Sequence, residues 1–112
     1  MTKRKIEIHE GGGDVFADLG LPSSEARMPK ASIVAELFRL IKGRGLTQVK
    51  AAKPVGIAQP DLSHLPRGDF DDHSAERLMK MLTAFEQDIE IVMKPHRGAG
   101  KPGRITFKAV AA

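Results

Sequence analysis

The residues of this chain that are best suited to chemistry are uncharged hydrogen-bonding side chains that follow Gly56 at helical spacing. Gln59 carries an amide, and Ser63 and His64 come about one helical turn later. An amide at the start of a helix can pair with N6 and N7 of adenine, and a hydroxyl or an imidazole one turn on can reach the next base edges. These side chains therefore predict contacts with the bases of a DNA duplex.

Other chemistries have weaker support in the spacing of the residues. Ser63 and His64 are neighbours, so they point to different sides of a helix and do not form a nucleophile–base pair. A hydrolase using His64 and Asp61 would need a pocket that so short a pair of helices can hardly build. No two histidines have the i, i+4 spacing of a helical metal site, and the chain has no cysteine. We therefore expect no enzyme, no metal site and no cofactor. The four histidines are scattered over segments of different type: His9, His64, His73 and His96.

The segment from Gly45 to Gly68 predicts two short helices joined by a turn. Thr47 is placed to cap a first helix that begins at Gln48. Gly56 suits a corner with a left-handed backbone. Tight helical hairpins also occur in proteins that bind no nucleic acid, so a hairpin alone does not decide the function. The residues expected to face inward are Ala51, Ala52 and Val55 on the first helix and Ile57, Leu62 and Leu65 on the second.

This segment resembles the Cro/cI-type (XRE) helix-turn-helix family. The resemblance implies a mainly α fold, with a lambda-repressor-like helix-turn-helix core of four to five helices and a short C-terminal β element. It also implies that the helix after Gly56 lies in the major groove of double-stranded DNA. The matching residues are Leu46-Thr47-Gln48, Ala51-Ala52, Gly56-Ile57-Ala58-Gln59, Leu62-Ser63 and Arg67-Gly68.

If the segment binds DNA, further roles follow from position. Thr47 and Gln48 open the first helix, where backbone N–H groups and a side-chain amide can meet a phosphate. Asp61 could accept a hydrogen bond from cytosine N4, but we interpret it as a solvated residue. The other expected phosphate contacts are Arg44, Lys50 and Arg67.

Three prolines depart from the family pattern. Pro54 falls late in the first motif helix, where a proline in a regular interior costs about 3 kcal/mol. Pro60 lies in the first turn of the second helix, where the N–H groups are unpaired anyway. Pro66 should end that helix abruptly. We therefore expect short motif helices with local distortion.

The flanking sequence predicts further helices. Ser23 or Ser24 is expected to cap a short helix that Pro29 interrupts, and a long helix is expected from Lys30 to Lys42. The segment Gly43-Arg44-Gly45 should end that long helix. Ser74 should cap a later helix, from Ala75 to about Glu86. The expected buried residues are Ile33, Leu37, Leu40 and Ile41 on the long helix and Leu78, Met79, Leu82 and Phe85 on the later one.

Alternating apolar residues at Ile89–Met93 indicate a strand after the helices. Proteins seldom leave a strand edge open. Pairing with a two-fold mate would form a homodimer, and the alternative is an intramolecular hairpin with Arg104–Val110. Lys5–His9 predicts a further short edge strand. The residues assigned to the dimer strand are Ile89, Ile91 and Met93.

A second resemblance covers residues 14–94. The order of segments is similar to that of HigA-like antitoxins and their stand-alone relatives: an apolar segment at Asp14–Leu21, then the motif, a helix and Ile89–Met93. This resemblance implies a repressor that autoregulates its operon and also blocks a RelE- or HigB-like toxin. The alternatives are a stand-alone XRE regulator without a toxin and a protein-interaction module that has lost DNA reading.

The composition suits one small domain. The 112 residues are 41% hydrophobic and 29% charged. We find no apolar run of the roughly 18 residues that a membrane span needs and no secretory signal, so we expect a cytoplasmic protein. The division we predict is a flexible segment at 1–14, a helix-turn-helix domain with a dimerising strand at 15–94, and a basic tail or hairpin strand at 95–112.

The charge favours a polyanionic partner, with one objection. The net charge is +4, and the isoelectric point is near 9.6. Carboxylates surround the second motif helix and would oppose phosphate binding: Asp61, Asp69, Asp71, Asp72 and Glu76. On balance we predict a sequence-specific repressor that binds a pseudo-palindromic operator as a homodimer. The basic residues gather at the two ends: Lys3, Arg4 and Lys5, and then Lys94, Arg97, Lys101, Arg104 and Lys108.

Overall fold

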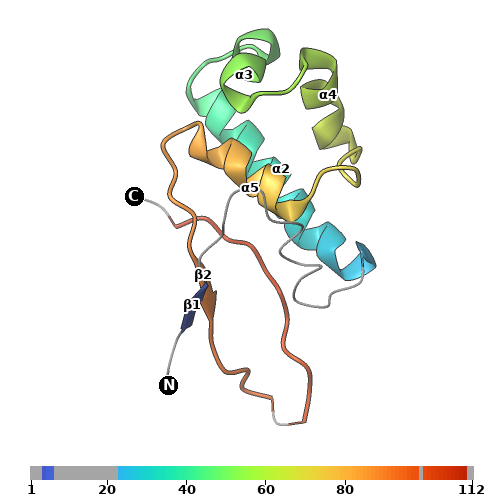
Figure 1. The fold of residues 1–112 in the computed structure, drawn as a ribbon, viewed down its shortest axis with the longest axis vertical. Helices are drawn as coiled ribbons and strands as arrows, with labels where there is room; N and C mark the ends of the chain where they lie inside the picture. The colour runs from blue at the N-terminus through green and yellow to red at the C-terminus, as the bar shows by residue number, and fades with distance from the viewer. Residues whose placement is uncertain (1–3, 7–22, 99, 111–112) are drawn as a thin grey trace.

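A long helix, α2 (Ser23–Gly43), runs through the helical part of the molecule (Figure 1). The computed structural model describes residues 4–6, 23–98 and 100–110. Two short strands pair beside the helices, so the expected mainly α fold with a short β element is confirmed. The remaining elements are α3 (Gln48–Val55), α4 (Gln59–His64), the 3₁₀ helix η1 (Leu65–Arg67), α5 (Ala75–Thr83), β1 (Arg4–Ile6) and β2 (Ile91–Met93).

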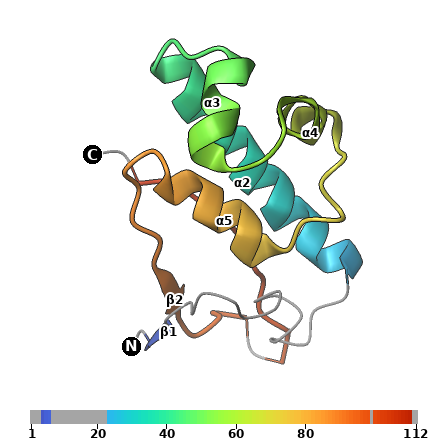
Figure 2. The same cartoon turned by 45° about the horizontal axis from the view of Figure 1, so that its top comes forward.

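The core lies where α2 crosses α5, and α4 with η1 covers it from one side (Figure 2). Ile33 and Leu37 of α2 are fully buried there, as is Phe85 just after α5. Leu62 and Leu65 bring the last turn of α4 and the start of η1 into the same cluster. Full burial of one such side chain contributes about 1.5–3 kcal/mol. None of the helices in the described ranges is long and apolar enough to cross a membrane.

The prediction that Pro29 interrupts the first helix is wrong. Pro29 lies inside α2, which begins at Ser23 and not at Lys30. A proline in a helix removes one backbone hydrogen bond and crowds the preceding turn. Pro29 is buried, so the apolar surface that it removes from water offsets part of that cost. The apolar segment Asp14–Leu21, which was expected to precede the helices, lies outside the described residues.

Helix α2 ends with a glycine cap, as predicted. Gly45 adopts a left-handed backbone with φ of 66°. Its N–H donates to the carbonyl of Lys42 at 3.0 Å, and the N–H of Leu46 donates to the carbonyl of Ile41 at 3.2 Å. This pair of bonds is the Schellman motif, which satisfies carbonyls that a helix end leaves free. The chain is thereby turned directly into α3.

Helix α3 begins and ends as expected. The Thr47 hydroxyl accepts a hydrogen bond from the N–H of Lys50 at 3.2 Å, and Gly56 ends the helix with φ of 84°. The N–H of Gly56 donates to the carbonyl of Ala52 at 2.8 Å. Pro54 stands in the last turn, so it removes only one late hydrogen bond and the helix continues to Val55.

The other two prolines have the predicted effects on α4: Pro60 is tolerated in the helix, and Pro66 follows its early end. Pro60 occupies the first turn, and the helix ends at His64 after six residues. Pro66 falls within η1, where the chain tightens into a 3₁₀ turn that closes at Gly68. The motif helices are therefore short, and the second one changes type before it ends.

Helix α5 has the predicted N-terminal cap but ends earlier than predicted. The Ser74 hydroxyl accepts a hydrogen bond from the N–H of Arg77 at 3.0 Å. The helix ends at Thr83 and not near Glu86, because Glu86 takes a left-handed backbone with φ of 63° that no α-helix can contain. Phe85 lies in the turn between them and remains 1% exposed.

The strand β2 pairs with β1, and this partner was not predicted. The two strands are antiparallel, with Lys5 opposite Val92. The alternative of a hairpin with Arg104–Val110 is wrong, because that segment contains no strand. Its Ile105 and Phe107 are partly buried against the core instead. Apolar packing on the helices therefore holds this segment in place of strand hydrogen bonds.

The N-terminal strand and the dimer strand both differ slightly from their predicted bounds. β1 covers Arg4–Ile6 within a segment expected to be flexible, and the expected Lys5–His9 strand extends beyond the described residues. Ile89 precedes β2 and is partly buried on the core. Only Ile91 and Met93 of the expected dimer residues lie in the strand itself.

The turn at Gly56 provides a stability test. Gly56→Ala should lower the free energy of unfolding by about 1–2 kcal/mol, because an L-residue resists the left-handed backbone there. A Cβ at this position would meet nothing within 4 Å, so the loss would come from the backbone and not from a clash. Urea denaturation measures it.

Gly43→Ala is the matched control for this variant. Gly43 ends α2, its Cβ position is also open, and its backbone is not left-handed. Alanine is the better helix former, so this control should be neutral or stabilising. Equal losses in the two variants would contradict the assignment of the cost to the left-handed turn.

Candidate nucleic-acid interface

The outer face of α4 is open to solvent. Leu62 is 0% exposed and directs that side of the helix into the core. Pro60, Asp61 and His64 are exposed, and Gln59 is partly exposed. Figure 2 shows α4 at the edge of the helical part, with α3 beside it. Of the side chains that were predicted to read bases, His64 is thus exposed, and Gln59 and Ser63 are partly exposed.

Gln59 is the candidate base-reading residue with the freest polar group. It is the first residue of α4. Within the described part of the chain its amide makes no hydrogen bond, so both the donor and the acceptor side are available. A carboxamide offers one acceptor and two donors, which matches the N6 and N7 edge of adenine.

Ser63 and His64 are partly engaged within the protein. The Ser63 hydroxyl donates to the carbonyl of Pro60 at 2.8 Å, so it remains available mainly as an acceptor. Nδ1 of His64 lies 3.2 Å from a carboxylate oxygen of Asp69. Because a carboxylate only accepts, we assign the proton to Nδ1, which leaves Nε2 of a neutral ring as an acceptor. Both residues are therefore suited to bases that present an amino group.

Two of the predicted phosphate contacts are unpaired cations beside this face. Lys50 follows the cap of α3, and Arg67 ends η1; both are exposed. Neither forms an ion pair with another described residue. Gln48 opens α3 and is partly exposed, whereas the Thr47 hydroxyl is occupied by the cap. The backbone and side chains at the start of α3 thus provide donors next to the positive charge of Lys50.

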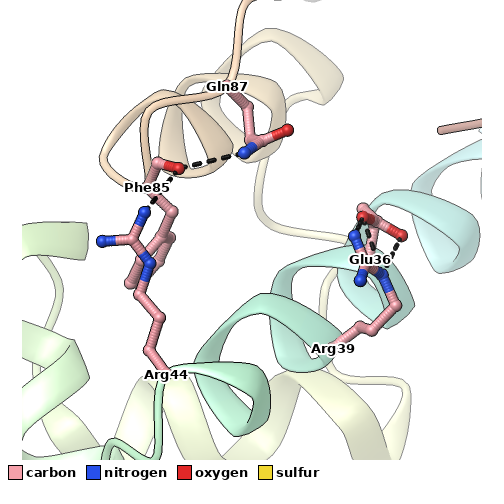
Figure 3. A network of polar contacts seen from close by, with 5 residues as sticks. All are labelled: Glu36, Arg39, Arg44, Phe85 and Gln87. Atoms are coloured by element: carbon pink, nitrogen blue, oxygen red, sulfur yellow. Dashed lines mark hydrogen bonds and ion pairs between the residues drawn. The ribbon is translucent and has the colours of Figure 1, made fainter. Parts of the chain in front are cut away.

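Arg44 lies elsewhere. Its guanidinium donates to the carbonyl of Phe85 at 3.0 Å and lies over the Phe85 ring, 5.4 Å from the ring centre (Figure 3). Glu86 is within 4.0 Å of the same guanidinium, and the Gln87 amide also donates to the Phe85 carbonyl, at 3.1 Å. Arg44 thus joins the end of α2 to the end of α5, a role that its place in the sequence did not indicate.

Figure 3 also shows a charge pair on the surface of α2. Nε of Arg39 donates to the two carboxylate oxygens of Glu36 at 2.9 and 3.0 Å. These hydrogen bonds, together with the negative charge of Glu36, raise the pKa of the Arg39 guanidinium. The pair belongs to the helix surface and does not take part in the candidate interface.

One of the acidic residues near α4 is paired with a cation, and another accepts a hydrogen bond from a histidine. Asp69 contacts His64, and Asp71 forms an ion pair with Arg27 of α2. The Arg27 guanidinium also donates to the carbonyl of Gly68 at 3.1 Å and lies 4.6 Å from the centre of the Phe70 ring. Sequence reasoning missed Arg27, since its partners lie more than 40 residues away. The acidic loop therefore carries less free negative charge toward DNA than its composition indicated.

His73 lies in the turn before α5 and is partly buried. Its Nδ1 is buried without a hydrogen-bond partner in the described part of the chain. Burial lowers the pKa of His73, and the positive charges of Arg77 and Lys30 lower it further, while Asp61 and Asp72 act in the opposite direction. The neutral imidazole is therefore the form that the fold prefers. No three His, Cys, Asp or Glu side chains of the described ranges gather in a group that could hold a metal ion.

The molecule resembles known proteins in sequence and in fold. Residues 15–94 match a family model for a helix-turn-helix domain. A solved structure whose name assigns it to the XRE family of transcriptional regulators is 35% identical to this chain, with a TM-score of 0.72. The match covers 80% of this chain and 100% of the other. No match is found among curated proteins.

The pKa of His73 predicts a pH dependence of stability. Its ordinary value is 6.5, and the folded value is lower, so the unfolded chain binds more protons between the two values. The contribution of His73 to stability is therefore complete above the ordinary pKa and is lost as the pH falls through the folded pKa. Urea denaturation between about pH 8 and about pH 5 should show this loss.

The control for the pH prediction is His73→Gln, which keeps a polar side chain but does not titrate. The free energy of unfolding of this variant should depend less on pH than that of the natural chain over the same interval. An unchanged pH dependence would show that His73 is not the group responsible.

Proposed function

This chain belongs to the XRE family of helix-turn-helix transcriptional regulators, and we propose that it is a sequence-specific, homodimeric repressor that reads its operator with α4. The observation that carries this proposal is the orientation of α4. Leu62 packs one side of the helix against the core, and Pro60 and His64 are exposed on the other side. Gln59, at the first position of the helix, is partly exposed, and its amide makes no hydrogen bond with a described residue. A helix held in this way can enter the major groove without rearrangement of the fold.

The base contacts follow from the hydrogen-bonding state of each side chain. The Gln59 amide makes no hydrogen bond with any described residue, which leaves its donors and its acceptor available, and we assign it to an adenine. Ser63 and His64 present acceptors, since their protons are directed to the Pro60 carbonyl and to Asp69. We assign these two residues to base amino groups one turn further along the groove.

The phosphate contacts that we favour are Lys50 and Arg67. Both are exposed next to the motif and form no ion pair with a described residue. Gln48 and the backbone at Thr47 would complete the cradle, because the start of a helix attracts anions. Arg44 ranks below them, because reaching a phosphate would require it to leave Phe85. Exposed basic residues after β2 would add attraction without base specificity: Lys94, Arg97, Lys101, Arg104 and Lys108.

We place the dimer contact on the ribbon formed by β1 and β2. Val92 and Met93 are 43% and 42% exposed, which is high for large apolar side chains. A two-stranded ribbon is marginal by itself, and β1 occupies only one edge of β2. A second copy added to the ribbon would make a larger sheet. It would also allow two α4 helices to contact successive major grooves, about 34 Å apart.

A finer proposal is that the protein is a HigA-like antitoxin that represses its own operon and binds a RelE- or HigB-like toxin. Its support is the resemblance of residues 14–94 to that group. Coexpression with the product of the adjacent reading frame tests it. A complex that survives purification and restores growth would support the antitoxin role, and an absent or inert neighbour would favour a stand-alone regulator.

The reading role of Gln59 can be tested on an operator selected from random duplexes. Gln59→Ala should cost about 1–3 kcal/mol at one base-pair position and leave affinity for unrelated DNA almost unchanged. Lys50→Ala is the contrasting variant: it should weaken binding to every sequence and reduce the salt slope by about 1. Fluorescence anisotropy at two salt concentrations separates the two effects.

Two results would contradict these roles. Equal weakening by Gln59→Ala on every sequence would mean that Gln59 contacts phosphate. If the natural chain showed neither a sequence preference nor a salt dependence, the protein would be an interaction module and not a repressor.

The dimer surface has its own test. Val92→Asp should shift the protein from dimer to monomer in sedimentation equilibrium, because two carboxylates brought together across the joined ribbons would repel. Val110→Asp is the matched control: Val110 is 87% exposed and belongs to neither strand of the ribbon, so this variant should remain dimeric. A monomeric natural chain, or an unchanged Val92→Asp dimer, would exclude this surface.

A further inference from the structure

Pro60 is an exposed apolar residue in the first turn of α4, next to Gln59 in the sequence. Its ring has no N–H and no polar side-chain atom, so it cannot form a hydrogen bond with a base edge. Its carbonyl already accepts the Ser63 hydroxyl at 2.8 Å. Pro60 therefore presents a rigid hydrocarbon surface to a ligand, next in sequence to the Gln59 amide.

Pro60 is also held in position by the way α4 begins. The residue before the helix is Ala58, which provides no side-chain cap, and a proline follows in the first turn. Proline has a backbone angle already suited to this position and reduces the freedom of the unfolded chain. The ring thus moves with the helix as one body, and little conformational freedom remains to be lost when it contacts DNA.

The major groove contains one apolar group at the base edges, the 5-methyl of thymine. A hydrocarbon ring pressed against any other edge would remove water from an amino or carbonyl group without replacing its hydrogen bond. Against a thymine it would bury the methyl group, which is favourable. Contact with the ring is therefore favourable at thymine and unfavourable at the polar edges of the other bases.

We propose that Pro60 is a specificity-determining residue that selects a thymine, through its 5-methyl group, next to the base pair read by Gln59. This inference rests on the proposed function, because it requires α4 to enter the major groove. It assigns an adenine and a neighbouring thymine, on either strand, to each half of the operator. This role accounts for a proline at a position of α4 where a polar residue could have formed a hydrogen bond with a base.

The test removes the methyl group alone. A duplex selected by the full chain from a random pool is resynthesised with each thymine replaced in turn by deoxyuridine, and binding is measured by fluorescence anisotropy. At one thymine in each half-site, next to the adenine recognised by Gln59, the replacement should weaken binding about threefold to tenfold. Replacements elsewhere should have little effect.

Two variants assign that effect to Pro60. For Pro60→Ser, the duplexes with thymine and with deoxyuridine should bind equally at this position, while Gln59→Ala should keep the full difference. A circular dichroism spectrum confirms that each variant is folded. The scan on the natural chain does not depend on either variant, so it remains decisive if Pro60→Ser fails to fold.

The outcomes separate this inference from the function on which it rests. A chain that selects no sequence would overturn both. A chain that selects an operator but tolerates deoxyuridine at every position would overturn the role of Pro60 and leave the repressor intact. A full methyl effect in folded Pro60→Ser would assign the contact to another residue and would also overturn the inference.

Discussion

The burial of Leu62 and Leu65 is the interaction on which the candidate interface depends. Helix α4 has six residues, which is too short for a helix to be stable in isolation. The two leucines are 0% exposed and join α4 and η1 to the cluster between α2 and α5. Because the buried side of the helix is set in this way, the opposite side, with Pro60 and His64, has one defined direction toward solvent. The surface that binds DNA in our proposal is thus positioned by side chains that do not touch DNA.

Two arginines connect the ends of α2 to distant parts of the chain in a similar manner. Arg27 lies over Phe70 and binds the carbonyl of Gly68. Arg44 lies over Phe85 and binds its carbonyl. Each guanidinium combines a cation–π contact with a hydrogen bond to the backbone, and each is partly exposed, so its energy is modest. The main effect of these contacts is to position the backbone: Arg27 binds the loop after η1, and Arg44 binds the turn after α5.

These contacts also change how the charge of the chain should be interpreted. Composition places several carboxylates near the reading helix, which is unfavourable for DNA binding. In the structure, Asp71 is paired with Arg27, while Lys50 and Arg67 remain unpaired among the described residues. The electrostatic balance at the interface is therefore more favourable than a count of residues indicates.

Local chemistry in the sequence was sufficient to predict much of the helical part. The cap at Thr47, the left-handed turn at Gly56 and the cap at Ser74 involve partners within four residues, so the sequence pattern predicts them directly. The buried stripes of α2 and α5 follow from helical periodicity in the same way. Only the tertiary structure could decide the continuation of α2 through Pro29, the pairing of β2 with β1 and the engagement of Arg44 by Phe85. Each of these depends on packing against, or bonding with, a segment far along the chain, and the energy of such a contact is not set by neighbouring residues.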